Sequence, residues 1–133
     1  MRSLPLILAV SLLAAGCGDD SPTSPSPFPA SLTLAPGEQG NAGGLTVVFN
    51  GVTDDSRCPI DALCIQAGDA NANITLTTGG VGSQYALTVN KADTRRVTFR
   101  DFQVELATLQ PSRRAAVSIE PSAYRATFTI TKP

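Results

Sequence analysis

Apolar and polar residues alternate in several short stretches of the chain, and this pattern constrains the fold more than any other feature. Between residues 70 and 77, Ala70, Ala72, Ile74 and Leu76 alternate with asparagine and threonine. A period of two places the apolar side chains on one face of a β-strand, as in a strand that is buried on one side. Full or shorter versions of the pattern occur in residues 31–34, 45–52, 70–77, 85–89, 97–99, 102–107 and 124–131.

Turn-forming residues separate these stretches. Pro36-Gly37, the glycine-rich run 40–44 and Gly79-Gly80 are expected to form turns. No stretch has the spacing of an amphipathic helix, so at most one helical turn is expected, at residues 59–63. A brief extended piece is expected at residues 117–119. The sequence therefore predicts an all-β fold, an antiparallel β-sandwich or partly open barrel of six to eight short strands.

The first 16 residues have the organisation of an export signal. Arg2 precedes an apolar run that ends at Ala15, too short for the ~20 residues of a membrane span but within the ~7–15 of a signal-peptide core. The run ends in Leu13-Ala14-Ala15-Gly16-Cys17, which resembles a bacterial lipobox. The resemblance implies cleavage before Cys17 and acylation of that cysteine, with chains such as palmitate. The alternative is an ordinary secretory signal cut near Ala15, with Cys17 free.

The rest of the chain is expected to divide into a tether and one domain. Residues 17–30 would comprise the lipidated Cys17 and a Pro/Ser-rich tether, which extends by about 3.1 Å per residue. Residues 31–133 would form the β-sandwich domain. Two or more acyl chains anchor a protein stably, so the membrane is the expected partner. Gly18 follows Cys17 where an aspartate would favour the inner membrane, so we expect the outer membrane of a bacterial envelope.

Two further cysteines lie close together in the middle of the chain. Once Cys17 carries lipid, Cys58 and Cys64 form an even pair. In an exported chain such a pair predicts a disulfide, and thus an oxidising compartment. We expect this disulfide to close a turn between two strands.

The residues around these cysteines resemble a small, uncharacterised family of bacterial lipoproteins. The pattern consists of Asp55-Ser56-Arg57-Cys58-Pro59, then Cys64, then Ala67-Gly68 before a strand. The similarity extends from about residue 32 to residue 130, and the chain departs from the family at Gln66, where tryptophan is favoured. The resemblance implies an all-β domain and export, and it implies no reaction.

Four aspartates surround the cysteine pair and allow two interpretations. In the first, they accept hydrogen bonds from backbone amides in turns, and Arg57 pairs with a carboxylate or with carbonyls. In the second, they bind calcium, which takes six to eight oxygen ligands, although the spacing is not that of an EF-hand loop. These residues are Asp54, Asp55, Asp61 and Asp69.

Five arginines in the second half of the chain are expected to gather on one edge of the domain. They would form either a solvated edge that resists strand addition or a docking site for an anionic partner. They are Arg95, Arg96, Arg100, Arg113 and Arg114.

The composition excludes several kinds of chemistry. The chain has no histidine, so Ser-His-Asp and Cys-His schemes are absent, and two cysteines alone fall short of a zinc site. A formal net charge of −1 gives no case for nucleic acid. We therefore expect no cofactor and a non-enzymatic, membrane-anchored binding or envelope-structural module. The alternatives are a calcium-dependent module using the residues between Asp54 and Asp69, or a small hydrolase based on carboxylates.

Overall fold

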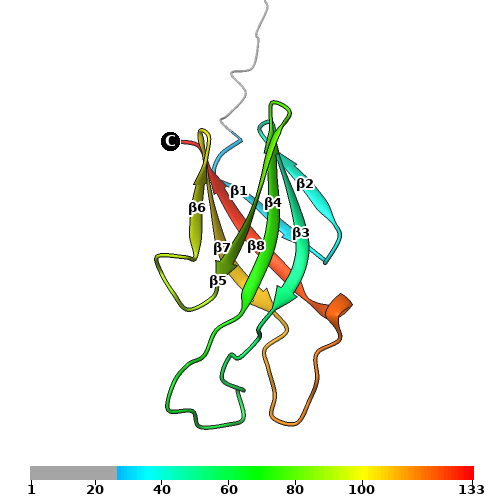
Figure 1. The fold of residues 1–133 in the computed structure, drawn as a ribbon, viewed down its shortest axis with the longest axis vertical. Helices are drawn as coiled ribbons and strands as arrows, with labels where there is room; N and C mark the ends of the chain where they lie inside the picture. Colours follow the sequence, from blue (N-terminus) through cyan, green and yellow to red (C-terminus); the bar gives the residue numbers. More distant parts are fainter. Residues whose placement is uncertain (1–26) are drawn as a thin grey trace, which may run out of the picture.

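The computed structural model describes residues 27–133, so the proposed signal peptide, Cys17 and most of the tether lie outside the described part. Two four-stranded antiparallel sheets make up the domain (Figure 1). The first sheet contains, in spatial order, β1 (Ala30–Leu34), β8 (Arg125–Thr131), β7 (Phe102–Gln110) and β6 (Arg96–Phe99). The second contains β2 (Gln39–Ala42), β3 (Leu45–Thr53), β4 (Asn71–Thr78) and β5 (Val81–Thr88). The prediction of an all-β fold with six to eight strands is confirmed.

The apolar faces of the two sheets share one core. On β4, Ala72, Ile74 and Leu76 are fully buried, as their alternation with asparagine and threonine predicts. Phe49 of β3 and Phe128 of β8 meet between the sheets, with ring centroids 5.9 Å apart and an edge-to-face geometry. The alternating pattern therefore sets which face of each strand is buried.

The glycine-rich run 40–44 forms a strand as well as a turn, so the prediction of a turn alone was wrong. β2 pairs with β3, from Gln39 opposite Val48 to Ala42 opposite Leu45. Gly43 and Gly44 make the hairpin turn between them, with φ of 54° and 93°. Gly40 lies within the strand, and a larger residue would be crowded there because its Cβ would lie 3.0 Å from Leu32 Cδ1. A residue with no side chain leaves no alternation to read, so the pattern missed this strand.

Two smaller expectations also differ from the structure. Residues 59–63 form a turn, closed by a hydrogen bond from Ala62 N–H to Pro59 O (3.2 Å), and the short helix is a 3₁₀ turn at Pro121–Ala123 instead. Residues 117–119 lie in an irregular connection and belong to no strand. Among residues 27–133, no helix is long and apolar enough to cross a lipid bilayer.

The long connections gather at one end of the domain. They join β3 to β4 (residues 54–70), β5 to β6 (residues 89–95) and β7 to β8 (residues 111–124). Figure 1 shows the first and third connections at the bottom and the second at the lower left, whereas the first described residues and the C terminus lie at the top. We call the surface formed by residues 54–70, 89–95 and 111–124 the loop end.

Candidate functional site at the loop end

A buried ion pair lies at the centre of the loop end. The Nε and Nη2 atoms of Arg57 donate hydrogen bonds to Oδ1 and Oδ2 of Asp55, each at 2.8 Å. The two side chains are only 10% and 12% exposed. A bidentate contact of this kind fixes the orientation of both groups. The turn formed by residues 55–57 is therefore held in place by the side chains at its two ends.

The same pair connects residues that are far apart in the chain. Arg57 also donates from Nη1 to Leu109 O and from Nη2 to Pro111 O, both at 3.0 Å. The hydroxyl of Tyr124 donates to Asp55 Oδ2 at 2.8 Å. The connection 54–70 is thereby tied to both ends of the connection 111–124. We call Asp55, Arg57 and Tyr124 the Arg57 lock.

Electrostatics in the lock favour one protonation state. Burial alone would raise the pKa of Asp55, but the hydrogen bonds from Arg57 and Tyr124 and the charge of Arg57 hold this pKa below its ordinary value. The hydrogen bond to Asp55 raises the pKa of Arg57 despite burial. Burial, followed by the hydrogen bond to Asp55, raises the pKa of Tyr124. The lock therefore consists of a carboxylate, a guanidinium ion and a neutral phenol.

These shifts predict how stability depends on pH. Because the pKa of Asp55 is lower in the folded state, Asp55 adds to the free energy of unfolding. This contribution is complete above the unfolded pKa of about 3.9 and is lost as pH falls through the folded pKa. Because the pKa of Tyr124 is raised, its contribution is complete below about pH 10 and is lost as pH rises through the folded pKa. Urea unfolding measured from acid to alkaline pH is expected to show a loss of unfolding free energy at each end. A Tyr124→Phe variant that keeps the full alkaline loss would contradict the assignment.

A disulfide closes part of the connection 54–70 at the loop end. Cys58 and Cys64 are bonded, as predicted, within the connection between β3 and β4. Between the disulfide and the sheet, Ser56 N–H donates to Asp69 O (2.6 Å) and Cys58 N–H donates to Ala67 O (2.8 Å). The two arms of the loop, residues 56–58 and 67–69, therefore pair like short strands. A disulfide indicates an oxidising, extracytoplasmic compartment.

Apolar side chains cover the tip that the disulfide closes. Leu63 and Ile65 on either side of Cys64 are fully exposed, with 104% and 105% of their reference areas, and Ile60 is 60% exposed. A hollow of about 270 Å³ lies beside the tip, and one of about 370 Å³ lies along the connection 111–124. The first is lined in part by Ile60, Val89 and Arg113, and the second by Val117 and Ile119. The loop end thus combines exposed apolar groups with shallow hollows.

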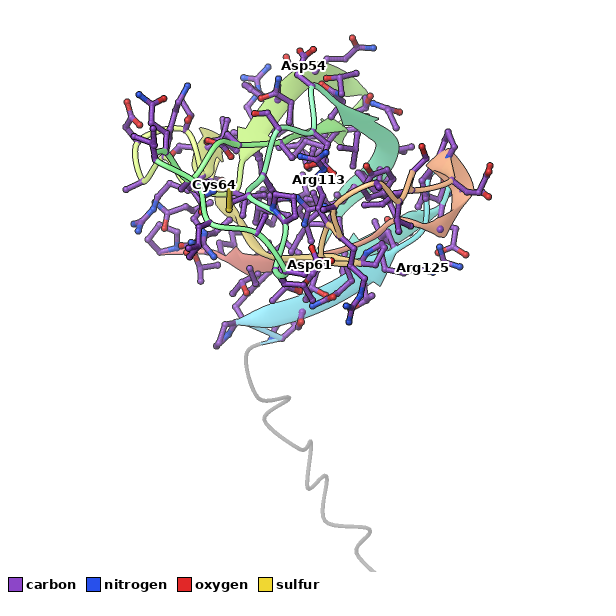
Figure 2. All side chains as sticks on the ribbon, turned by 90° about the horizontal axis from the view of Figure 1, so that it is seen from below. Asp54, Asp61, Cys64, Arg113 and Arg125 are labelled. Carbon is purple, nitrogen blue, oxygen red and sulfur yellow. A yellow bond between two sulfur atoms is a disulfide. The ribbon has the colours of Figure 1, made fainter. Side chains whose placement is uncertain are left out.

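The four aspartates near the cysteines have separate partners. Asp55 belongs to the lock, and Asp61 Oδ1 accepts a hydrogen bond from Ala115 N–H at 2.8 Å. Asp54 Oδ2 accepts a long hydrogen bond from Asn71 Nδ2 at 3.4 Å. In Figure 2, which views the loop end directly, Asp54 and Asp61 lie on opposite sides of Arg113. Between residues 27 and 133, no three Asp, Glu, His or Cys residues are placed to hold a metal ion.

Asp69 caps a different part of the backbone. Its Oδ1 atom accepts hydrogen bonds from the N–H groups of Ala70, Val89 and Asn90, at 2.9, 2.8 and 3.0 Å. Its Oδ2 atom is buried and has no hydrogen-bond partner in the described part of the chain. Asp69 therefore joins the start of β4 to the connection that follows β5. This is the backbone contact that the turn interpretation describes, and calcium binding stays an untested prediction.

The five arginines do not gather on one edge, contrary to the expectation from the sequence. Arg100 lies in the turn before β7, and Arg113 follows the end of that strand, so they occupy opposite ends of the domain. Arg95 donates to Leu106 O and Ala107 O on β7, and Arg96 pairs with Glu105 at 3.6 Å. Arg113 donates to Arg57 O at 2.7 Å, while Arg114 is exposed at the loop end. Three of the five thus have partners within the domain: Arg95 and Arg113 donate to backbone carbonyls, and Arg96 pairs with a carboxylate.

Sequence reasoning missed the third member of the lock. It placed Tyr124 on the apolar face of the last strand, and Tyr124 is indeed buried with the core. The residue lies just before β8, however, and its hydroxyl donates to Asp55. The signal available was a single hydroxyl on the otherwise apolar face of residues 124–130, 69 residues from its partner. Comparisons of the chain with family models, with curated proteins and with solved structures found no match.

Proposed function

We propose that this protein is an exported, lipid-anchored, non-enzymatic module of the bacterial cell envelope that binds a partner protein through its loop end. The observation that carries the proposal is the arrangement of the two ends of the domain. The chain enters β1 at the end opposite the loop end (Figure 1). Lipid on Cys17 would hold the entry end towards the membrane, so the loop end would face away from it.

The exposed apolar side chains support binding at that end. Five large apolar side chains are exposed in residues 27–133, and four of them lie at the loop end. These four are Ile60, Leu63, Ile65 and Val117. Grouped exposed apolar residues are typical of interaction surfaces, and a rigid loop loses little conformational entropy on binding. The disulfide and the Arg57 lock supply that rigidity.

The non-enzymatic part of the proposal is supported by how the ionisable groups are used. Among residues 27–133, the groups with shifted pKa values are Asp55, Arg57 and Tyr124, and each is hydrogen-bonded to another member of this set or to the backbone. The chain also has no histidine to act as a general base. The structural contacts of these three groups thus account for their shifted pKa values without a catalytic role.

The anchor is tested by replacing Cys17. In bacteria that produce the full chain, the protein is expected in the membrane fraction, extractable by detergent. Cys17→Ser is expected to move most of it to the soluble extracytoplasmic fraction. Recovery of the unsubstituted protein in the soluble fraction would exclude the lipid anchor.

The binding surface is tested by site-specific photo-crosslinking in the same cells. A photoreactive amino acid is placed at Leu63, and in a matched control at Val81, which is exposed on β5 away from the loop end. We expect one reproducible protein adduct from position 63, none from position 81, and loss of the adduct when Ile65→Glu is added. Equal labelling from both positions, or no adduct from either, would contradict binding through the loop end.

A further inference from the structure

The sheet formed by β2–β5 has an outer face without charge. None of the residues in these four strands is Asp, Glu, Lys or Arg, although 16% of the whole chain is charged. The strands of the other sheet carry Arg96, Glu105 and Arg125. Soluble domains are designed with about 25–35% charged residues on their surface, so a whole uncharged face calls for a specific explanation.

Amide and hydroxyl groups replace the missing charges. The register places Asn41, Thr46 and Thr77 in one row across the sheet, and Thr75 opposite Gln84 in the next. Asn73 and Asn71 follow on the same face of β4. Each of these side chains has both donor and acceptor capacity or presents a hydroxyl that can do either. The face therefore offers a dense, neutral array of hydrogen-bonding groups.

A hollow of about 420 Å³ lies within this array. Its lining includes Asn50, Asn73, Gln84 and Ala86. Ala86 pairs with Asn73, so its short side chain leaves room between the longer groups of Asn50 and Gln84. The volume falls within the ~300–1,000 Å³ of typical ligand sites. The hollow is thus large enough for a small polar ligand or for one unit of a polymer.

The amides in the hollow are held in place and retain free acceptors. Asn50 Nδ2 donates to Thr75 Oγ1 at 2.9 Å, and Asn73 Nδ2 donates to Thr53 Oγ1 at 3.1 Å. These bonds fix the side chains, and neither Oδ1 atom accepts a hydrogen bond from another described residue. Gln84 makes no side-chain hydrogen bond within residues 27–133. A ligand rich in hydroxyl groups would find acceptors in the two asparagines and both kinds of group in Gln84.

We propose that this face binds a neutral, polyhydroxylated ligand, an uncharged glycan chain, with one sugar unit in the hollow lined by Asn50, Asn73 and Gln84. An ionic ligand would find no opposite charge in these strands. The face has no arginine, and Tyr85, which also lines the hollow, packs against the core and Phe99. A protein partner would therefore find few of the exposed aromatic and arginine anchors on which most interfaces depend. The site is separate from the loop end, so it adds a second binding activity to the proposed function.

The test uses the full-length protein in detergent or, if Cys17→Ser is soluble, that variant, with neutral tetrasaccharides of glucose and of N-acetylglucosamine as probes. Binding is followed by the side-chain amide signals of Asn50, Asn73 and Gln84 in NMR spectra. At least one probe is expected to shift these signals. Gln84→Ala is expected to weaken binding about 3–10-fold, since one neutral hydrogen bond is lost. Asn50→Ala is a second variant with the same expectation.

The matched control is Gln103→Ala, a glutamine on the outer face of β7 in the other sheet. It and Leu63→Glu at the loop end are expected to leave glycan affinity unchanged, which separates this site from the partner site. Melting temperatures equal to that of the unsubstituted protein show that the variants fold. The proposal is overturned if no neutral tetrasaccharide shifts the amide signals at millimolar concentration, or if both Gln84→Ala and Asn50→Ala bind as tightly as the original chain.

Discussion

Replacing Arg57 with methionine is expected to lower the free energy of unfolding by about 3–5 kcal/mol. The substitution keeps most of the side-chain volume but removes the partner of Asp55, whose carboxylate is 12% exposed. It also leaves Leu109 O and Pro111 O without the donors that satisfy them. Removing one member of a buried ion pair costs more than the pair itself contributes, because the remaining charge stays buried. Urea unfolding at neutral pH measures the difference.

The matched control is Arg96→Met. Arg96 also pairs with a carboxylate, Glu105, but at 3.6 Å and with both side chains exposed by more than a third. Exposed pairs contribute about 0–1 kcal/mol, so this variant is expected to unfold almost as the original chain does. If Arg57→Met does not fold, Tyr124→Phe tests the same lock with an expected loss of about 1–3 kcal/mol. Equal effects of Arg57→Met and Arg96→Met would contradict a structural role for the lock.

Gly68→Ala is expected to destabilise the protein by about 2–4 kcal/mol. Gly68 has a φ of +64°, and a Cβ there would lie 1.7 Å from the backbone oxygen of Ser56. A backbone atom cannot rotate away as a side chain can, so the two arms of the loop must separate. This disturbs the hydrogen bonds from Ser56 N–H to Asp69 O and from Asn90 Nδ2 to Gly68 O.

Gly79→Ala isolates the part of this effect that comes from backbone conformation. Gly79 has a φ of +56° in the hairpin between β4 and β5, and nothing lies within 4 Å of its Cβ position. It is expected to cost about 1–2 kcal/mol. Thermal unfolding of both variants gives the comparison. A Gly68→Ala protein as stable as Gly79→Ala would show that the arms of the loop are not packed as described.

The sequence predicted the core of this fold well because alternation is a local property. Ile74 and Phe128 could be assigned to buried faces from their immediate neighbours, and both are fully buried. The strand Gln39–Ala42 could not be predicted, because Gly40 is accommodated by Leu32 and Leu34 from another strand. Local pattern reports which face of a strand is apolar but not which other strand lies against it.

The candidate site was predictable only in part for the same reason. The sequence suggested that Arg57 pairs with a carboxylate or with carbonyls, and it does both, with Asp55, Leu109 and Pro111. The role of Tyr124 depends on a contact 69 residues distant in the chain. The uncharged outer face likewise becomes evident only when the register shows that β2–β5 form one sheet. Exposed Leu63 and Ile65 carry no sequence signal, since buried leucine and isoleucine look the same.

The proposed function joins two uses of cysteine, an acylated Cys17 and a bridge between Cys58 and Cys64. Mass spectrometry of peptides from the protein, purified from bacterial membranes without reductant, tests both at once. We expect a mature chain that begins at Cys17 and carries acyl chains, together with one disulfide-linked peptide pair containing Cys58 and Cys64. A chain whose Cys17 carries no lipid, with free thiols at residues 58 and 64, would contradict the account.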